Sequence, residues 1–194
     1  MKEKVTAKVI SQQEIAANIF DMWIETGLAK EAHPGQFIGV FPKNKSTILP
    51  RPISICEVNE EKTALRIVYR IAGQGTKEFS SFVAGDQVDI LGILGNGFPL
   101  EAGKGKKVFL MGGGIGVPPI LQLAKELDAD KQVVVGYRDS NLFLKEDLDK
   151  YAAVYVATED GSMGTKGNVM NAIEENALDA EVIYACGPMP MLRA

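Results

Sequence analysis

The first half of the chain alternates between apolar and polar residues over short stretches. Four of these stretches are rich in β-branched and aromatic residues and are separated by loops that contain Gly, Pro, Asn or Lys. Runs of this kind, bounded by turn-forming residues, are typical of β-strands. We therefore predict a small antiparallel barrel or sandwich, with strands at residues 5–9, 36–41, 65–71 and 87–91.

The second half has a different pattern. Residues 108–111 form an unbroken apolar run, and Ile120, Leu123, Ala124 and Leu127 follow it at helical spacing. Such runs are typical of strands that are buried on both faces of a parallel sheet, and their alternation with helices predicts a doubly wound α/β domain. Its ligands are expected at the carboxyl ends of the strands. Further strands are expected at 132–137, 153–157 and 181–185, and further helices near 142–147 and 168–175.

The pattern changes near residue 102, which predicts two domains at 1–102 and 103–194. The 194 residues, 46% hydrophobic and 24% charged, exclude a disordered or fibrous chain. A formal net charge of -4 provides no field to hold nucleic acid or an anionic membrane, so we expect neither as a partner. The charged start and the lack of a long apolar window predict a soluble cytoplasmic protein.

The reactive side chains are few. Cys56 and Cys186 are the only cysteines, and His33 is the only histidine. A zinc site or a Ser-His-Asp triad is therefore nearly excluded, and we expect no metal site built from these residues. A bound cofactor is expected to supply the chemistry.

Four glycines, at positions 112, 113, 114 and 116, lie between a predicted strand and a helix that starts with prolines. Glycines let a ligand approach the backbone, and the first turn of the helix offers free N–H groups to an anion. Because Val117 stands where the third small residue belongs, the dinucleotide fingerprint G-x-G-x-x-G is not met. A tight turn without a ligand is the alternative, but three consecutive glycines cost more backbone entropy than turning requires.

Two segments of the first half could also meet an anion. Arg51 lies between two prolines that stiffen the backbone, and Ser54 follows at the start of a strand. Thr76 can cap a short helix that extends through Phe82, which would provide a second set of free amides. An exposed edge-strand arginine and ordinary helix capping are the alternatives.

Two further segments matter, one shortly before the second half and one near its end. A glycine loop at 92–99 is expected to join the two halves. Cys186 is expected at the carboxyl end of a buried strand, where a doubly wound domain places its ligand. The alternative is a buried structural thiol.

Together these segments resemble the ferredoxin reductase-like superfamily. The matching motifs are R-P-x-S at 51–54, G-x-G-T at 73–76, G-G-G-x-G-x-x-P at 112–119 and C-G-P-x-x-M-L at 186–192. Within it, stretches 51–55, 94–98 and 158–167 are most similar to the electron-transfer subunits of NAD-dependent dihydroorotate dehydrogenases. The resemblance implies an FAD-binding barrel at 1–102 and an NAD(H)-binding domain at 103–194 that is truncated at its C-terminus.

The resemblance also implies roles in the barrel. Arg51 would meet the FAD pyrophosphate, and Ser54 would lie at the reactive edge of the flavin ring near N5. Ile53 stands where many flavin reductases carry an aromatic residue, so stacking would come from aliphatic contact or from another residue. The other implied contacts, which border the flavin, its adenosine arm or its phosphates, are Pro52, Tyr69, Arg70, Gly75 and Thr76.

In the second domain, the resemblance implies an NAD(H) site in which Cys186 lies beside the nicotinamide. Ser54 and Cys186 are thus the candidate catalytic residues. Arg138 and Asp139 follow the second strand, and because Arg suits a 2′-phosphate and Asp a free ribose hydroxyl, they leave NADPH and NADH open. The resemblance favours NADH. The implied NAD(H) contacts are Gly112, Gly114, Gly116, Thr158, Asp160, Cys186 and Gly187.

The implied activity is hydride transfer between FAD and NAD(H), which relays electrons from dihydroorotate oxidation to NAD+ in pyrimidine biosynthesis. The implied partner is the FMN-containing catalytic subunit of dihydroorotate dehydrogenase, in a heterotetramer. Similar subunits continue into a tail with four cysteines that hold a [2Fe-2S] cluster, whereas this chain stops at Ala194. We expect a cluster only if such a tail exists, and otherwise a variant that passes electrons directly.

Two other functions remain open at this point. The chain could be the FAD/NAD(H) subunit of a ferredoxin-NAD(P) oxidoreductase or of a sulfhydrogenase, which share most of these motifs. It could also be a non-enzymatic flavin-binding or assembly module. The loop at 95–98 favours the resemblance to the dihydroorotate dehydrogenase subunit.

Overall fold

The structure is a computed structural model that describes residues 3–44 and 49–193. It divides into two compact units, Met1–Gly97 and Phe98–Ala194, slightly before the predicted boundary at residue 102. The reason is that residues 98 and 99 pack within the second unit. The ring of Phe98 lies 5.8 Å from that of Tyr184, whose hydroxyl donates to the carbonyl oxygen of Pro99 at 2.8 Å. The charged start of the chain begins in residues 1–2, which lie outside the described part.

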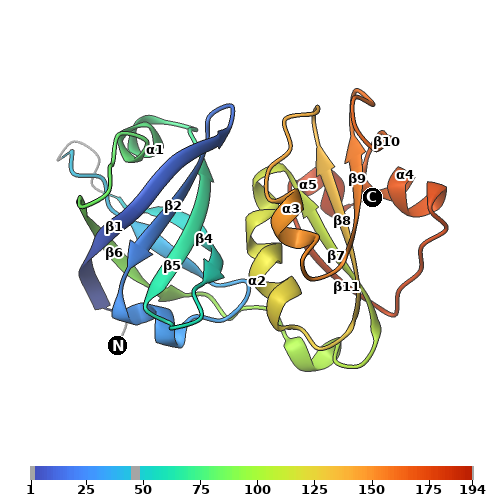
Figure 1. The fold of residues 1–194 in the computed structure, drawn as a ribbon, viewed down its shortest axis with the longest axis horizontal. Coiled ribbons are helices and arrows are strands. Elements are labelled where there is room, and N and C mark those ends of the chain that lie inside the picture. The colour runs from blue at the N-terminus through green and yellow to red at the C-terminus, as the bar shows by residue number, and fades with distance from the viewer. Residues whose placement is uncertain (1–2, 45–48, 194) are drawn as a thin grey trace. The chain divides into compact units, whose positions relative to one another are not determined.

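The first unit is a closed antiparallel barrel, as predicted, with the strand order β1-β2-β5-β4-β3-β6 (Figure 1). Its interior is filled by apolar residues from every strand, among them Met22, Ile38, Ile55, Ile67 and Ile90, all at most 1% exposed. Part of the predicted 92–99 loop, up to Leu94, belongs to the last strand. The strands are β1 (Glu3–Ala16), β2 (Ile19–Glu25), β3 (Phe37–Val40), β4 (Arg51–Val58), β5 (Ala64–Arg70) and β6 (Gln87–Leu94), with a 3-10 turn at Gly27–Glu31.

A short helix, α1 (Gln74–Phe79), follows β5. The helix ends at Phe79 rather than at Phe82 as predicted, and although Thr76 takes part in its capping, it is not the residue that precedes the helix. Thr76 instead lies inside the first turn, where its hydroxyl oxygen accepts from the amides of Ala72 (2.8 Å) and Gly73 (3.2 Å). Its side chain therefore holds the turn that leads into the helix.

The second unit is a five-stranded sheet with the order β10-β9-β8-β7-β11, in which all neighbours are parallel (Figure 1). This confirms the predicted α/β class. Phe109, Met111 and Val134 pack with α4 on one face, and α2 contacts α3 and β7. The elements are β7 (Lys107–Gly113), α2 (Pro118–Glu126), β8 (Asp130–Tyr137), α3 (Lys145–Leu148), β9 (Ala153–Thr158), β10 (Thr165–Lys166), α4 (Val169–Glu175), β11 (Val182–Cys186) and α5 (Met189–Leu192).

β11 differs from its prediction as a buried strand. In the described sheet it lies at an edge, next to β7 alone, and Ile183 is 60% exposed. Its apolar composition suggested burial on both faces, but the order of strands places it outermost. As for membrane segments, none of the helices in the described ranges is long and apolar enough to cross a bilayer.

Candidate functional site

Arg51 and the first turn of α1 lie against each other, although 24 positions of sequence separate Arg51 from Gly75. A Cβ built on Gly75 would lie 2.9 Å from Nε of Arg51 and 3.3 Å from Cγ of Pro42, so a larger residue would displace the arginine. The guanidinium also donates to the carbonyl oxygen of Leu49 at 2.9 Å. Because the first amides of a helix have no acceptor within it, a fixed cation here lies beside unpaired N–H donors. That combination suits a phosphate group.

Ser54 lies where β4 has one open edge. Residues Arg51 to Ser54 pair with β3, but the pairing of β4 with β5 in the described barrel starts at Ile55, opposite Ile67. The last residues of β5 are therefore not paired with the first residues of β4 in the described barrel. Ser54 is half-buried at this opening. A flat ligand that enters between the two strands could meet its hydroxyl and the backbone of β4.

The residues around this opening have different degrees of access. Pro52 and Arg70 are exposed and Ile53 is half-buried. Tyr69 is only 1% exposed, its ring stacks on Phe20 at 5.8 Å, and burial raises the pKa of its phenol. The side chain of Tyr69 thus belongs to the barrel core, and only its backbone is left to border a ligand.

Glu78 is a residue of this site that the sequence analysis does not identify. Its carboxylate accepts from the backbone amides of Lys43 and of Asn44, the latter at 3.2 Å. The ammonium of Lys43 lies over the ring of Phe82, 4.8 Å from its centroid. These contacts hold the segment after β3 against α1. A lone glutamate inside a short helix carries no sequence signal for this role.

In the second unit, the glycine turn packs against the segment that follows β11. A Cβ on Gly116 would lie 2.6 Å from the carbonyl carbon of Cys186 and 2.8 Å from Cα of Gly187, and one on Gly113 would lie 2.6 Å from the sulfur of Met191. Gly114, by contrast, has a φ of 52° and open space where a Cβ would be. The structure therefore brings the two predicted motifs together and leaves one side of the turn free. Pro118 starts α2 as predicted.

Cys186 ends β11 directly beside Gly112, its partner in the parallel pairing. The thiol is half-buried, and burial raises its pKa. At neutral pH the side chain is therefore a small neutral group at the carboxyl end of the sheet. Such a group can pack against a ring without adding a charge.

Thr158 ends another strand, β9, at the same end of the sheet, and Asp160 lies in the loop that follows it. Since β9 is three strand spacings from β11, Thr158 is about 14 Å from Cys186 across the sheet. Thr158 is fully buried, and its hydroxyl donates to the carbonyl oxygen of Met163 at 2.7 Å. Asp160 is exposed, and hydrogen bonds from Ser162 lower the pKa of its carboxyl. Thr158 thus braces the loop after β9, whereas Asp160 faces outward.

The two residues that bear on the choice between NADH and NADPH, Arg138 and Asp139, have different surroundings. Arg138 is exposed. A carboxylate oxygen of Asp139 accepts from the backbone and side-chain nitrogens of Asn141, at 2.8 and 2.7 Å. Asp139 is therefore partly occupied by its own turn.

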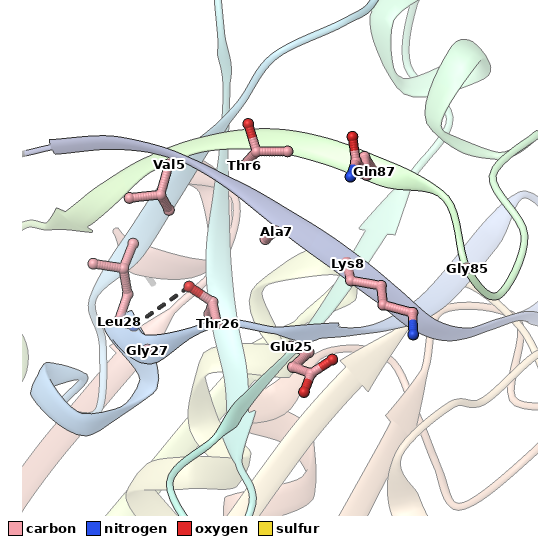
Figure 2. A pocket seen from close by; sticks show the side chains of 10 residues that line it. All are labelled: Val5, Thr6, Ala7, Lys8, Glu25, Thr26, Gly27, Leu28, Gly85 and Gln87. Carbon is pink, nitrogen blue, oxygen red and sulfur yellow. Dashed lines mark hydrogen bonds between the residues drawn. The ribbon is translucent and has the colours of Figure 1, made fainter.

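A hollow of about 640 Å³ lies elsewhere on the barrel, and none of the predicted site residues lines it (Figure 2). β2 ends at Glu25 and turns away, while β1 continues its pairing with β6. Thr26 and Leu28 close one side of the hollow, and the Thr26 hydroxyl accepts from the Leu28 amide at 3.3 Å. We assign it no part in the candidate site. In residues 3–44 and 49–193, three or more His, Cys, Asp or Glu side chains nowhere gather as metal ligands would.

Comparison with known proteins gives close relatives over the full chain. The electron transfer subunit of dihydroorotate dehydrogenase B (NAD(+)) from Streptococcus mutans is 42% identical over 198 residues, which cover all of this chain and 76% of the relative. The subunit of the same name from Bacillus cereus (strain B4264) is 41% identical over 201 residues, covering all of this chain and 78% of the relative. No family model matches the chain.

Solved structures agree with the fold. An NADH-dependent reduced ferredoxin-NADP oxidoreductase superposes with a TM-score of 0.84 at 26% identity, over all of this chain and 71% of the other. A ferredoxin NADP+ reductase from Neisseria gonorrhoeae, solved with bound FAD and NADP, gives a TM-score of 0.82 at 16% identity, over 98% of this chain and 87% of the other. The second likeness concerns the fold alone.

Proposed function

The chain belongs to the family of electron transfer subunits of dihydroorotate dehydrogenase B (NAD(+)), and from this we propose that it is a flavoprotein subunit that moves a hydride between FAD and NAD(H). In this role it relays electrons from the oxidation of dihydroorotate in a catalytic partner subunit to NAD+. The observation that carries the proposal is the contact between Arg51 and Gly75. It places a cation beside the free amides of a helix, as the diphosphate of a dinucleotide requires.

The residues of the barrel fit FAD. Arg51 and the first turn of α1 would hold the diphosphate, with Gly75 allowing the close approach and Thr76 holding the turn. The open edge of β4 would receive the flavin ring, with Ser54 near its reactive edge and Ile53 against one side. Pro52 fixes the backbone between the two groups. Arg70 would lie near the adenosine arm.

The residues of the second unit fit NAD(H). Gly112, Gly114 and Gly116 would admit its phosphates, and the open side at Gly114 is where a backbone can meet a ligand. Cys186 and Gly187 would border the nicotinamide, and Asp160 would border the nucleotide from the loop after β9. When bound, FAD and NAD(H) exchange a hydride between flavin N5 and nicotinamide C4, which needs no acid or base from the protein. The chain contributes binding, orientation and the exclusion of water.

The proposed partner is the FMN-containing catalytic subunit, in a heterotetramer. The residues of this chain do not fit a cysteine-held [2Fe-2S] cluster, since Cys56 is buried in the barrel and Cys186 lies in the other unit. A second candidate is the FAD/NAD(H) subunit of a ferredoxin-NADP oxidoreductase, which the superposition on such an enzyme favours.

Anaerobic addition of NADH to the purified chain loaded with FAD tests the proposal. We expect the absorption band of the oxidised flavin to bleach as the hydride is transferred. NADPH in the same experiment tests the choice of nucleotide. A chain that binds FAD but keeps its spectrum would be a flavin-binding module without reductase activity. A chain that takes up no FAD would contradict the proposal altogether.

Replacing Arg51 with Ala is expected to weaken FAD binding by about 10- to 150-fold. A charge-assisted hydrogen bond to a phosphate contributes about 1.5–3 kcal/mol, and that contribution would be lost. Fluorescence titration of the apoprotein measures the dissociation constant. Lys77→Ala is the control, because it removes an exposed cation from the same helix without touching Arg51. Equal affinities for Arg51→Ala and the unsubstituted chain would remove Arg51 from the diphosphate site.

A further inference from the structure

Gln12, inside β1, joins three elements of the barrel. Its Nε2 donates to the carbonyl oxygens of Phe79 at 3.0 Å and Phe82 at 2.8 Å, and its Oε1 accepts from the hydroxyl of Tyr69 at 2.8 Å. Two carbonyl acceptors fix the orientation of the amide, because only its NH2 group can donate to them. Gln12 therefore ties β1 both to β5 and to the end of α1.

This tie matters because α1 has only six residues. A helix of that length is not stable alone, so contacts from the barrel must set its position. Phe79 and Phe82 provide an apolar anchor, with ring centroids 5.9 Å apart and at most 5% exposure. Apolar packing is non-directional, whereas hydrogen bonds depend on both distance and angle. The hydrogen bonds of Gln12 thus define where the end of α1 lies along the barrel.

The other end of α1 carries the contact with Arg51. A Cβ on Gly75 would lie 2.9 Å from Nε of Arg51, so the helix and the guanidinium are packed closely, with no room for a further atom between them. A shift of α1 would therefore change the distance from its first amides to Arg51. Both groups must reach the same diphosphate, and its affinity depends on that distance.

We infer that Gln12 is a positioning residue for the diphosphate of FAD. It does not touch the ligand, and it acts by holding α1 in register with Arg51. The inference rests on the proposed function. If Gln12 positions α1 for the diphosphate, its loss should lower the affinity for flavins that carry a diphosphate and not for those that lack one. A general stabilising role would not distinguish the two kinds of flavin.

The test compares FAD with riboflavin in Gln12→Leu, which keeps a side chain of similar size but removes all three hydrogen bonds. We expect the dissociation constant of FAD to rise about 10-fold and that of riboflavin to stay close to the value of the unsubstituted chain. Gln13→Leu is the matched control, because Gln13 is the exposed neighbour on the same strand. It should change neither affinity.

Two further measurements separate positioning from damage to the fold. In an Arg51→Ala background, Gln12→Leu should add little to the loss of FAD affinity. Gln12 acts by aligning α1 with the guanidinium of Arg51, and that guanidinium is absent in this background. If Gln12→Leu does not fold, Gln12→Glu serves instead. It keeps the acceptor for Tyr69 and sets a carboxylate against the two carbonyl oxygens, so the same selective loss of FAD is expected.

Additive losses, or equal losses for FAD and riboflavin, would overturn the positioning role and leave Gln12 as a structural residue. So would an unchanged affinity for FAD. These results leave the proposed function intact. An unsubstituted chain that binds no FAD would instead overturn the proposed function, and this inference with it.

Discussion

Replacing Arg66 with Met is expected to destabilise the barrel by about 3–5 kcal/mol, the usual result of leaving one charge of a buried pair without its partner. The guanidinium donates to both carboxylate oxygens of Asp21, at 3.0 and 2.8 Å, and lies 3.2 Å from a carboxylate oxygen of Glu57. The side chain of Asp21 is only 4% exposed, and that of Arg66 only 11%. Urea denaturation of the FAD-free protein would measure the loss without the stabilisation that a bound ligand adds.

Two further variants show whether buried charge is the cause. In Arg66→Met combined with Asp21→Asn, the more buried of the two carboxylates that Arg66 contacts is no longer charged, so part of the stability should return. Lys107→Met removes the cation of an exposed ion pair with Asp179 in the second unit and should have little effect. A loss of stability in Arg66→Met no larger than in Lys107→Met would mean that water solvates Asp21 and that the pair is not a buried one.

The same ion pair explains why β2 escaped prediction. Asp21 interrupts the apolar residues of Ile19–Glu25, and a lone acidic residue argues against a buried strand. What makes the strand possible is Arg66, 45 positions later, on the neighbouring strand β5. Nothing within the local window reveals that partner. The strands that the sequence does predict, such as those at 5–9 and 87–91, carry their own pattern of alternation.

The candidate site shows the same division between local and distant information. The glycine turn at 112–116 was predictable because a strand, a run of glycines and two prolines follow one another in the chain. The packing of Gly116 on Cys186, by contrast, depends on the parallel pairing of β11 with β7. The burial of Tyr69 and Thr158 could not be read either, because each side chain is enclosed by residues of other segments.

Gln12 is the clearest case of missing information. It lies in a polar run, 11–14, where neither spacing nor composition singles out one amide from its neighbours. Its partners are 57 to 70 positions away. Polar side chains in a barrel strand face outward by default, and only the end of α1 together with Tyr69 of β5 gives this one three hydrogen bonds.

Gly116→Ala is expected to slow the reduction of bound flavin by NADH by about 100-fold or more, while FAD binding in the other unit persists. The added methyl group would lie 2.6 Å from the carbonyl carbon of Cys186 and 2.8 Å from Cα of Gly187. These are backbone atoms next to the pairing of Cys186 with Gly112, so they cannot turn aside as a flexible side chain would. One of the two turns must shift, and a displacement of about 1 Å between reacting groups costs roughly this factor. Anaerobic stopped-flow measurement of flavin bleaching gives the rate.

Gly27→Ala is the matched control, since the same methyl group there has nothing within 4 Å. It should leave the rate of reduction unchanged. Loss of FAD from Gly116→Ala would show that the substitution unfolds the whole chain and does not merely displace the glycine turn. Gly116→Ser would then lose FAD as well. A Gly116→Ala protein that keeps its FAD and is reduced at the original rate would contradict the assignment of this turn to NAD(H). Only a turn that the nucleotide does not use could move without consequence for the hydride.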